Sequence, residues 1–162
     1  MSTGKIITFY SYKGGVGRTM ALANIAVLLS QWGFKVLAID WDLEAPGLHL
    51  YFRKLSELDS EQGLVEFIQA YATTRQAHWR DYLSTVQVPD ALQPLTLLTA
   101  GRQDDSYERR MQTIKWDVLY AADSFGNFLE QIRDAQLNRE IHSPTEALAL
   151  CDRLRGTSQT LP

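Results

Sequence analysis

The chain has 162 residues, of which 45% are apolar and 22% charged, a mixture typical of one soluble globular domain. Its formal net charge of −3 gives no overall basic character, so the charge does not support direct DNA binding. The single cysteine, Cys151, excludes an internal disulfide, and no apolar run approaches the ~20 residues that a membrane span needs. We therefore expect one domain over residues 1–162, located in the cytoplasm and without a transmembrane segment.

The first fifty residues predict a strand, a glycine-rich turn, a helix and a second strand. A run of β-branched and aromatic residues predicts the first strand at Ile6–Tyr10. A stretch rich in Ala and Leu predicts a well-buried helix over 18–32, which Gly33 ends, and a second apolar strand follows at Val36–Ile39. Because these strands are continuously apolar rather than alternating, we expect a parallel sheet that is covered on both faces and a βαβ unit over residues 1–50.

Beyond residue 50, the remainder of the chain (51–162) predicts further helices and one strand, with no internal repeat or linker. The helices are expected at 62–73, 77–85, 125–137 and 144–154, and the strand at 95–99. The fold class is therefore α/β.

The stretch SYKGGVGRTM (residues 11–20), here called the glycine loop, predicts a phosphate site between the first strand and its helix. Gly14, Gly15 and Gly17 allow a tight turn whose backbone N–H groups point at one anion, and the following helix adds its free N-terminal amides. Arg18 would then be the cation that meets the phosphates, and Thr19 the hydroxyl that binds Mg²⁺. The alternative is a glycine turn that binds no ligand.

Three segments carry a resemblance to a known family. YKGGVGRT (12–19) resembles the deviant Walker A motif K-G-G-x-G-K-[ST] of ParA/MinD-type ATPases, and it is most similar to a subgroup in which arginine replaces the second lysine. VLAIDWDLEAPGL (36–48) resembles the family's strand that ends in Asp-x-Asp, and LTLLTAGRQDDSY (95–107) the strand and loop that come next. The resemblance implies a P-loop NTPase fold, in which helices form two layers around a doubly wound, mostly parallel sheet.

The resemblance also implies a role for each matching residue. The nucleotide-binding set is Lys13, Gly14, Gly15, Val16, Gly17, Arg18, Thr19 and Met20. Lys13 would reach the partner's phosphates across a homodimer that encloses ATP, and Asp42 would orient the attacking water, which makes these two the catalytic residues. Thr19 would bind Mg²⁺ directly, and Asp40 would hold it through a water. From the residues alone, Asp40 and Asp42 also fit strand-end carboxylates that cap the next loop, and Trp41 between them is expected to pack under the site.

The resemblance breaks in the C-terminal third. In the family, an apolar Walker B strand ending in Asp follows the helix that FGNFLEQIRDAQLNRE (125–140) matches, but here IHSPTEALALCDRLRG (141–156) follows. We therefore expect the chain to be truncated before Walker B, with the C-terminal part of the fold missing or diverged. The alternative Walker B segment is VLYAADSFG (118–126), which offers Asp123.

The expected function is binding of ATP with Mg²⁺, coupled to dimerisation and to regulation of an unidentified protein partner, with ATP hydrolysis that is weak or absent in this chain. The preference for ATP over GTP rests on the resemblance alone. Two alternatives remain at this point: a non-catalytic nucleotide-binding interaction module, and an inactive fragment of a larger ATPase.

Overall fold

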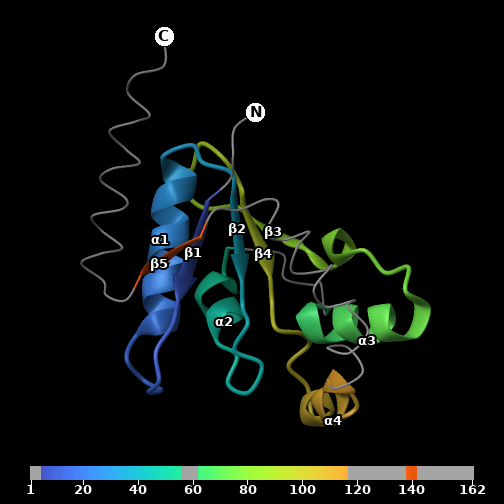
Figure 1. Cartoon of the computed structure of the whole chain (residues 1–162). Helices are drawn as coiled ribbons and strands as arrows, with labels where there is room; N and C mark the ends of the chain where they lie inside the picture. Colours follow the sequence, from blue (N-terminus) through green and yellow to red (C-terminus); the bar gives the residue numbers. More distant parts are fainter. Residues whose placement is uncertain (1–4, 56–61, 117–137, 142–162) are drawn as a thin grey trace.

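A computed structural model describes residues 5–55, 62–116 and 138–141 of the chain (Figure 1). In chain order, its elements are β1 (Ile6–Phe9), α1 (Arg18–Gln31), β2 (Val36–Ile39), α2 (Leu48–Phe52), α3 (Leu64–Thr74), the 3₁₀ helix η1 (Trp79–Tyr82), β3 (Ser84–Val86), β4 (Leu95–Leu98), α4 (Tyr107–Gln112) and β5 (Asn138–Ile141). The predicted strand–helix–strand succession at the start of the chain is confirmed, as is the α/β class.

The described strands form two hydrogen-bonded groups. β1 pairs in parallel with β5, with Ile6 opposite Asn138, while β2 pairs in parallel with β4, which in turn pairs antiparallel with β3. Helix α1 packs on both β1 and β2 and so joins the two groups. The strand pairing is therefore mixed. The pairs β1–β5 and β2–β4 are parallel, as predicted.

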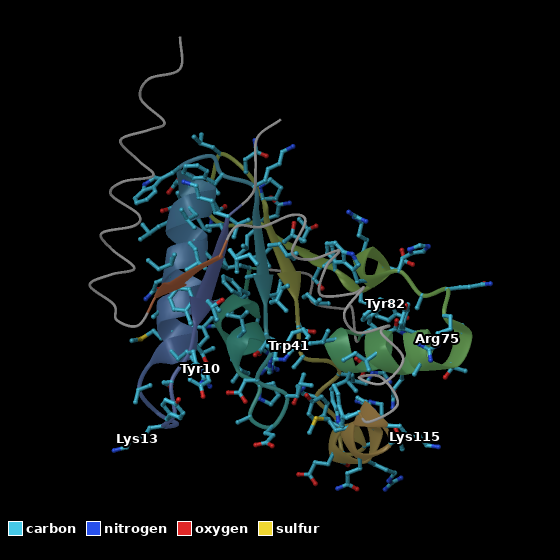
Figure 2. All side chains as sticks on the ribbon, in the orientation of Figure 1. Tyr10, Lys13, Trp41, Arg75, Tyr82 and Lys115 are labelled. Atoms are coloured by element: carbon cyan, nitrogen blue, oxygen red, sulfur yellow. The ribbon has the colours of Figure 1, made fainter. Side chains whose placement is uncertain are left out.

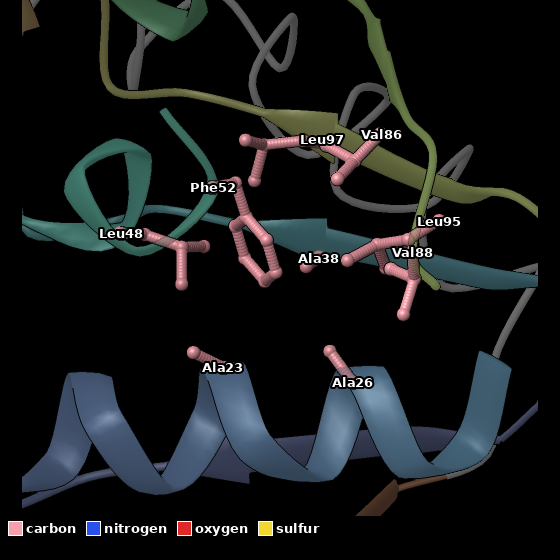
Figure 3. Close-up of a cluster of buried hydrophobic side chains, with 9 residues drawn as sticks. All are labelled: Ala23, Ala26, Ala38, Leu48, Phe52, Val86, Val88, Leu95 and Leu97. Carbon is pink, nitrogen blue, oxygen red and sulfur yellow. The ribbon is translucent and has the colours of Figure 1, made fainter. Parts of the chain in front are cut away.

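One hydrophobic cluster lies between α1 and the sheet (Figure 3). Ala23 and Ala26 project from α1 toward Ala38 of β2, and the small alanine side chains let the helix approach the sheet closely. Phe52 of α2, which is only 1% exposed, fills the space beside them. The cluster consists of Ala23, Ala26, Ala38, Leu48, Phe52, Val86, Val88, Leu95 and Leu97.

A second cluster covers the other side of β2 and β4. Leu97 belongs to the first cluster while its neighbour Leu98 packs with α3, as the alternation of side chains along a strand requires. The start of α3 is hydrogen-bonded to the end of β4, since the Leu64 N–H donates to the Thr99 carbonyl at 2.9 Å. Burial on both faces explains why β2, with the sequence Val-Leu-Ala-Ile, is apolar without alternation.

Gly63, directly before α3, lies against the backbone that follows β4. A β-carbon at this position would sit 2.5 Å from the Thr99 carbonyl oxygen and 2.7 Å from the Gly101 amide nitrogen. The Thr99 hydroxyl oxygen also lies in this space, and no side chain fits at position 63 because the two backbone atoms cannot move aside as a flexible side chain could.

Several predicted elements compare directly with the structure. The helix predicted at 62–73 and the strand at 95–99 are confirmed as α3 and β4. The helix predicted at 77–85 is wrong: this segment forms η1 followed by β3. In β3 the side chains of Ser84, Thr85 and Val86 alternate between buried and exposed, and the strand completes the free edge of β4.

The C-terminal predictions fall mostly outside the described residues. The helices predicted at 125–137 and 144–154, and the candidate Asp123, lie there, so they stay predictions. Residues 138–140, which we matched to the end of the family's helix, instead belong to β5. Pairing with β5 gives the backbone groups along one edge of β1 hydrogen-bond partners, which a helix there would leave unpaired.

In the described part of the chain, no helix combines the length and the hydropathy that crossing a bilayer would require.

Candidate functional site

The glycine loop joins β1 to α1 in a conformation that its glycines permit. Gly15 and Gly17 have φ angles of +72° and +79°, in the left-handed region that residues with a β-carbon rarely adopt. Gly17 is the N-cap of α1, and the first turn of this helix contains no acidic residue. A β-carbon built on Gly14 would meet nothing within 4 Å, so the space above the loop is open. A helix N-terminus whose first turn holds no carboxylate, next to a loop with open space above it, is an arrangement that can bind an anion.

Arg18 lies at the mouth of this loop, in the first turn of α1. Its Nη2 atom donates to Asp42 Oδ2 at 2.5 Å, and its Nη1 atom lies 3.4 Å from the Ser11 carbonyl oxygen. The Arg18 and Asp42 side chains are 29% and 31% exposed, so this ion pair is partly shielded from water. The guanidinium therefore connects the start of the glycine loop to the segment that follows β2.

Asp40 ends β2 and is the most buried carboxylate of the site, with 6% of its surface exposed. Its Oδ2 accepts hydrogen bonds from the N–H groups of Gly47 and Leu48, and its Oδ1 accepts one from the N–H of Asp42. These bonds fold residues 40–47, here called the aspartate loop, back onto the start of α2. The capping role that the residues alone suggested for Asp40 is therefore present in the structure.

Asp42 is held on both carboxylate oxygens. Oδ1 accepts from the Ala45 N–H at 3.2 Å, within the aspartate loop, while Oδ2 accepts from Arg18. Two hydrogen-bonded oxygens and an anchored backbone leave this side chain little rotational freedom in the protein without ligand.

Thr19 faces the aspartate loop from the first turn of α1. A β-carbon built on Gly47 would lie 3.8 Å from the Thr19 Cγ2 atom, so the Thr19 side chain lies against this glycine. The structure thus brings Thr19, Asp40, Asp42 and Arg18 together where β1 and β2 end. This is the edge of an α/β sheet at which ligands usually bind.

Lys13 lies apart from this cluster. It projects from the tip of the glycine loop, away from the body of the protein (Figure 2), and it is exposed. The Ser11 hydroxyl donates to the Lys13 carbonyl at 2.8 Å and so fixes the backbone of the tip. Val16 and Met20, the two apolar members of the predicted set, are 58% and 51% exposed.

Trp41 corrects one expectation. It does not pack under the site, because 44% of its surface is exposed on the aspartate loop (Figure 2). The hydrogen bonds that hold this loop are made by its two neighbours, Asp40 and Asp42, and the tryptophan between them stays partly in solvent.

The sequence reasoning missed two contributors, Ser11 and Gly47. Ser11 both fixes the loop tip and lies beside the Arg18 guanidinium, and its position two residues before Lys13 was the available signal for a serine turn. Gly47 donates to Asp40 and leaves room for Thr19, and the Pro-Gly pair at 46–47 was the available signal for a tight turn. Within the described residues, no group of three or more His, Cys, Asp or Glu side chains forms a metal cluster.

His49 in α2 lies next to the buried carboxylate. Burial lowers its pKa below the ordinary value, Asp40 acts in the opposite direction, and Arg53 lowers the pKa further. Its Nδ1 atom is buried and has no hydrogen-bond partner among the described residues. The neutral imidazole is therefore the favoured form in the folded protein.

The chain is similar to known nucleotide-binding proteins. Residues 7–151 match the family model described as the CobQ/CobB/MinD/ParA nucleotide binding domain. An uncharacterised ATP-binding protein of Methanocaldococcus jannaschii is 37% identical over 87 residues, which are 54% of this chain and 32% of that protein. A chloroplastic MinD homologue of Arabidopsis thaliana, a septum site-determining protein, is 46% identical over 48 residues, or 30% of this chain and 15% of that protein.

A third relative is an iron-sulfur cluster carrier protein of Aquifex aeolicus, 47% identical over 47 residues, which are 29% of this chain and 13% of that protein. The matched segments thus cover between 13% and 32% of these relatives' own lengths. The family match spans most of the chain and includes both the glycine loop and the aspartate loop. The chain belongs to the CobQ/CobB/MinD/ParA family of nucleotide-binding domains.

Proposed function

We propose that this chain binds ATP with Mg²⁺ in its glycine loop, and that binding controls dimerisation and a protein partner. The observation that carries the proposal is the conformation of the loop: two left-handed glycines open the backbone amides at the N-terminus of α1, and Arg18 stands at the mouth. Membership of a nucleotide-binding family and an ATP-binding relative support it.

The residues present fit a magnesium triphosphate. The amides of residues 14–19 and the N-terminus of α1 would hold the phosphates, and Arg18 would add a planar cation that can contact two oxygens. The Thr19 hydroxyl would bind Mg²⁺ directly. Asp40 would hold a water of the ion, since its Oδ1 atom accepts a single hydrogen bond from the protein and retains acceptor capacity. When bound, Mg²⁺ neutralises charge that develops on the phosphates.

Hydrolysis would depend on two further residues. Lys13, exposed at the loop tip, would reach the phosphates held by a second copy of the chain. Asp42 would orient the attacking water once its carboxylate is free of Arg18. The rate acceleration would be mostly electrostatic, from donors that are already in position when the nucleotide binds.

One observation favours the alternative of a non-catalytic nucleotide-binding module. β5 lies beside β1, and its sequence is Asn-Arg-Glu-Ile. This strand contains no aspartate, so it does not supply the carboxylate that ends a Walker B strand. Binding of ATP without turnover would favour this alternative. Turnover that Asp42→Ala abolishes would exclude it, and an absence of both binding and turnover would favour the inactive fragment.

The test of the proposed function replaces Gly17 by alanine and uses Gly33 as the matched control. Both glycines have a left-handed φ, +79° and +86°, but Gly33 lies at the far end of α1. Each substitution should cost roughly 1–2 kcal/mol of stability, because a β-carbon is strained in this region. We expect Gly17→Ala to lose Mg-ATP binding in isothermal titration and Gly33→Ala to retain it. Equal binding by both variants would overturn the assignment of the loop.

A further inference from the structure

We propose that Asp42 is an internal competitor for Arg18: in the protein without ligand it occupies the guanidinium, and a polyphosphate must displace the carboxylate to use that cation. The inference rests on the proposed function and adds a positioning role to Asp42. It predicts that this carboxylate lowers the affinity for nucleotide, which a residue that only orients water would not do.

Both ends of the Arg18 guanidinium fork already face protein acceptors. Nη2 donates to Asp42 Oδ2 at 2.5 Å, while Nη1 lies 3.4 Å from the Ser11 carbonyl oxygen and 3.5 Å from its hydroxyl. The bond to Asp42 is short and charge-assisted, whereas the contacts to Ser11 are at the limit of a hydrogen bond. Asp42 is therefore the partner that an incoming anion has to replace.

The aspartate loop presents the Asp42 carboxylate in a fixed position. The Asp42 N–H donates to Asp40, and Asp42 Oδ1 accepts from the Ala45 N–H. Asp40 is itself buried and bonded to the start of α2. Because these groups are ordered before any contact with Arg18, the ion pair costs less side-chain entropy than one between two freely rotating residues.

The charge of Arg18 is permanent, whereas the anion that pairs with it can change. Arginine does not lose its proton in proteins, so the competition is between two anions for one permanent cation. A triphosphate carries more charge and more acceptor oxygens than one carboxylate, so it can win this competition, but its apparent affinity equals the intrinsic affinity multiplied by the fraction of molecules in which the pair is open. Displacement would also free Asp42, so that nucleotide binding and release of the proposed water-orienting residue become one event.

The binding experiment compares Asp42→Asn with Glu44→Gln by isothermal titration with Mg-ATP and, separately, with inorganic tripolyphosphate. Asparagine keeps an oxygen that can accept from the Ala45 N–H, and Glu44 lies exposed on the same loop, so both variants remove one negative charge near the site. We expect Asp42→Asn to bind both ligands about fivefold more tightly, the order of a partly shielded charge-assisted pair. Glu44→Gln should change affinity by less than about twofold, since salt screens the remaining long-range charge.

The same comparison separates binding from turnover. Asp42→Asn should turn over ATP more slowly while binding it more tightly. Unchanged or weaker binding by this variant, or an equal gain in Glu44→Gln, would overturn the inference. Trp41, exposed beside Asp42, gives an independent readout: its fluorescence should change on addition of Mg-ATP and should already be shifted in ligand-free Asp42→Asn, with Trp41→Phe identifying the signal.

A second measurement needs no ligand. A double-mutant cycle of Arg18→Gln, Asp42→Asn and the double variant, followed by urea unfolding, reports the coupling of the two side chains in the free protein. Arg18→Lys supplies a further variant should Asp42→Asn fail to fold, because lysine keeps the charge but loses the fork and should weaken the coupling. If Arg18 and Asp42 are coupled but no variant binds nucleotide, both the proposed function and the competition are refuted, and only the ion pair itself is supported. Nucleotide binding without coupling would refute the inference alone.

Discussion

Asp40 and Asp42 stand two residues apart in one loop, but their environments differ. Asp40 is buried and bonded to backbone N–H groups, whereas Asp42 is partly exposed and paired with a cation. A buried carboxylate with several N–H donors fixes the fold of a loop, while a shielded but accessible one can exchange partners. The sequence predicted both residues as site residues, but it could not assign these environments, because they depend on where α2 begins.

His49 gives a pH-dependent prediction at the residue scale. Its pKa in the folded protein is lowered mainly by burial, so the unfolded chain binds this proton more readily. Stability contributed by the neutral imidazole is therefore present above the unfolded value near 6.5 and is lost as the pH falls below it.

We expect urea unfolding of the parent protein to show this loss as the pH falls below about 6.5, and His49→Gln to show a smaller one. His78→Gln is the matched control, because His78 is exposed before η1. A pH dependence that persists undiminished in His49→Gln would contradict the assignment.

At the scale of elements, helix α1 is apolar nearly all round because it is buried on two sides. Ala23 and Ala26 face the cluster on β2 and β4, while Ile25 and Leu29 face β1. The helix that carries Arg18 at its first turn is thus packed against both groups of strands. Composition alone predicted this burial correctly, since a helix with a polar face would have had one side in water.

Phe52 gives a prediction at the scale of elements, because the short helix α2 depends on its packing. Phe52→Ala should cost roughly 3–5 kcal/mol of unfolding free energy, as the alanines of α1 are too small to fill the cavity that it leaves. Tyr51→Ala on the same helix is the control, since Tyr51 is 49% exposed and should cost about 0.5 kcal/mol or less. Urea unfolding measures both, and equal losses would contradict the description of the cluster.

The wrong prediction at 77–85 has a physical cause. Trp79, Tyr82 and Leu83 have a helical spacing, and the 3₁₀ helix does form where that spacing begins. The segment then becomes a strand because the edge of β4 is available for pairing, which is tertiary information that a local pattern does not contain. By contrast, β4 and α3 were predictable because their periodicity and length were sufficient by themselves.

At the scale of the whole molecule, the exposed tip of the glycine loop leads to a prediction about assembly. Tyr10 and Tyr12, 60% and 95% exposed with their ring centroids 5.2 Å apart, lie in the same segment as Lys13. If a second copy of the chain covers this face, Mg-ATP should convert the monomer to a dimer in sedimentation velocity.

Lys13→Ala should bind ATP but remain monomeric, because it lacks the cation that reaches the partner's phosphates. Lys35→Ala is the control, since Lys35 is also exposed but precedes β2, at the opposite end of that strand from the site. Dimers of Lys13→Ala that form as readily as those of the parent would contradict the role of Lys13.

Only those parts of the site that are short sequence motifs could be predicted from the sequence. The glycine loop and the two aspartates are short motifs with a chemical meaning of their own, so they could be named in advance. The ion pair between Arg18 and Asp42 joins residues 24 positions apart, and its existence depends on how α1 and the aspartate loop meet. No spacing rule specifies such a contact.

Gly63 has a consequence for interpreting mutational tolerance in this protein. The carbonyl and hydroxyl oxygens of Thr99 lie where a β-carbon would be, so every replacement at position 63 should lower the amount of folded protein, as a replacement of the left-handed Gly17 should. A saturation library scored by abundance would rank these two positions together, although position 63 meets only atoms of the protein itself. Selection for triphosphate retention among stably folded variants would separate them.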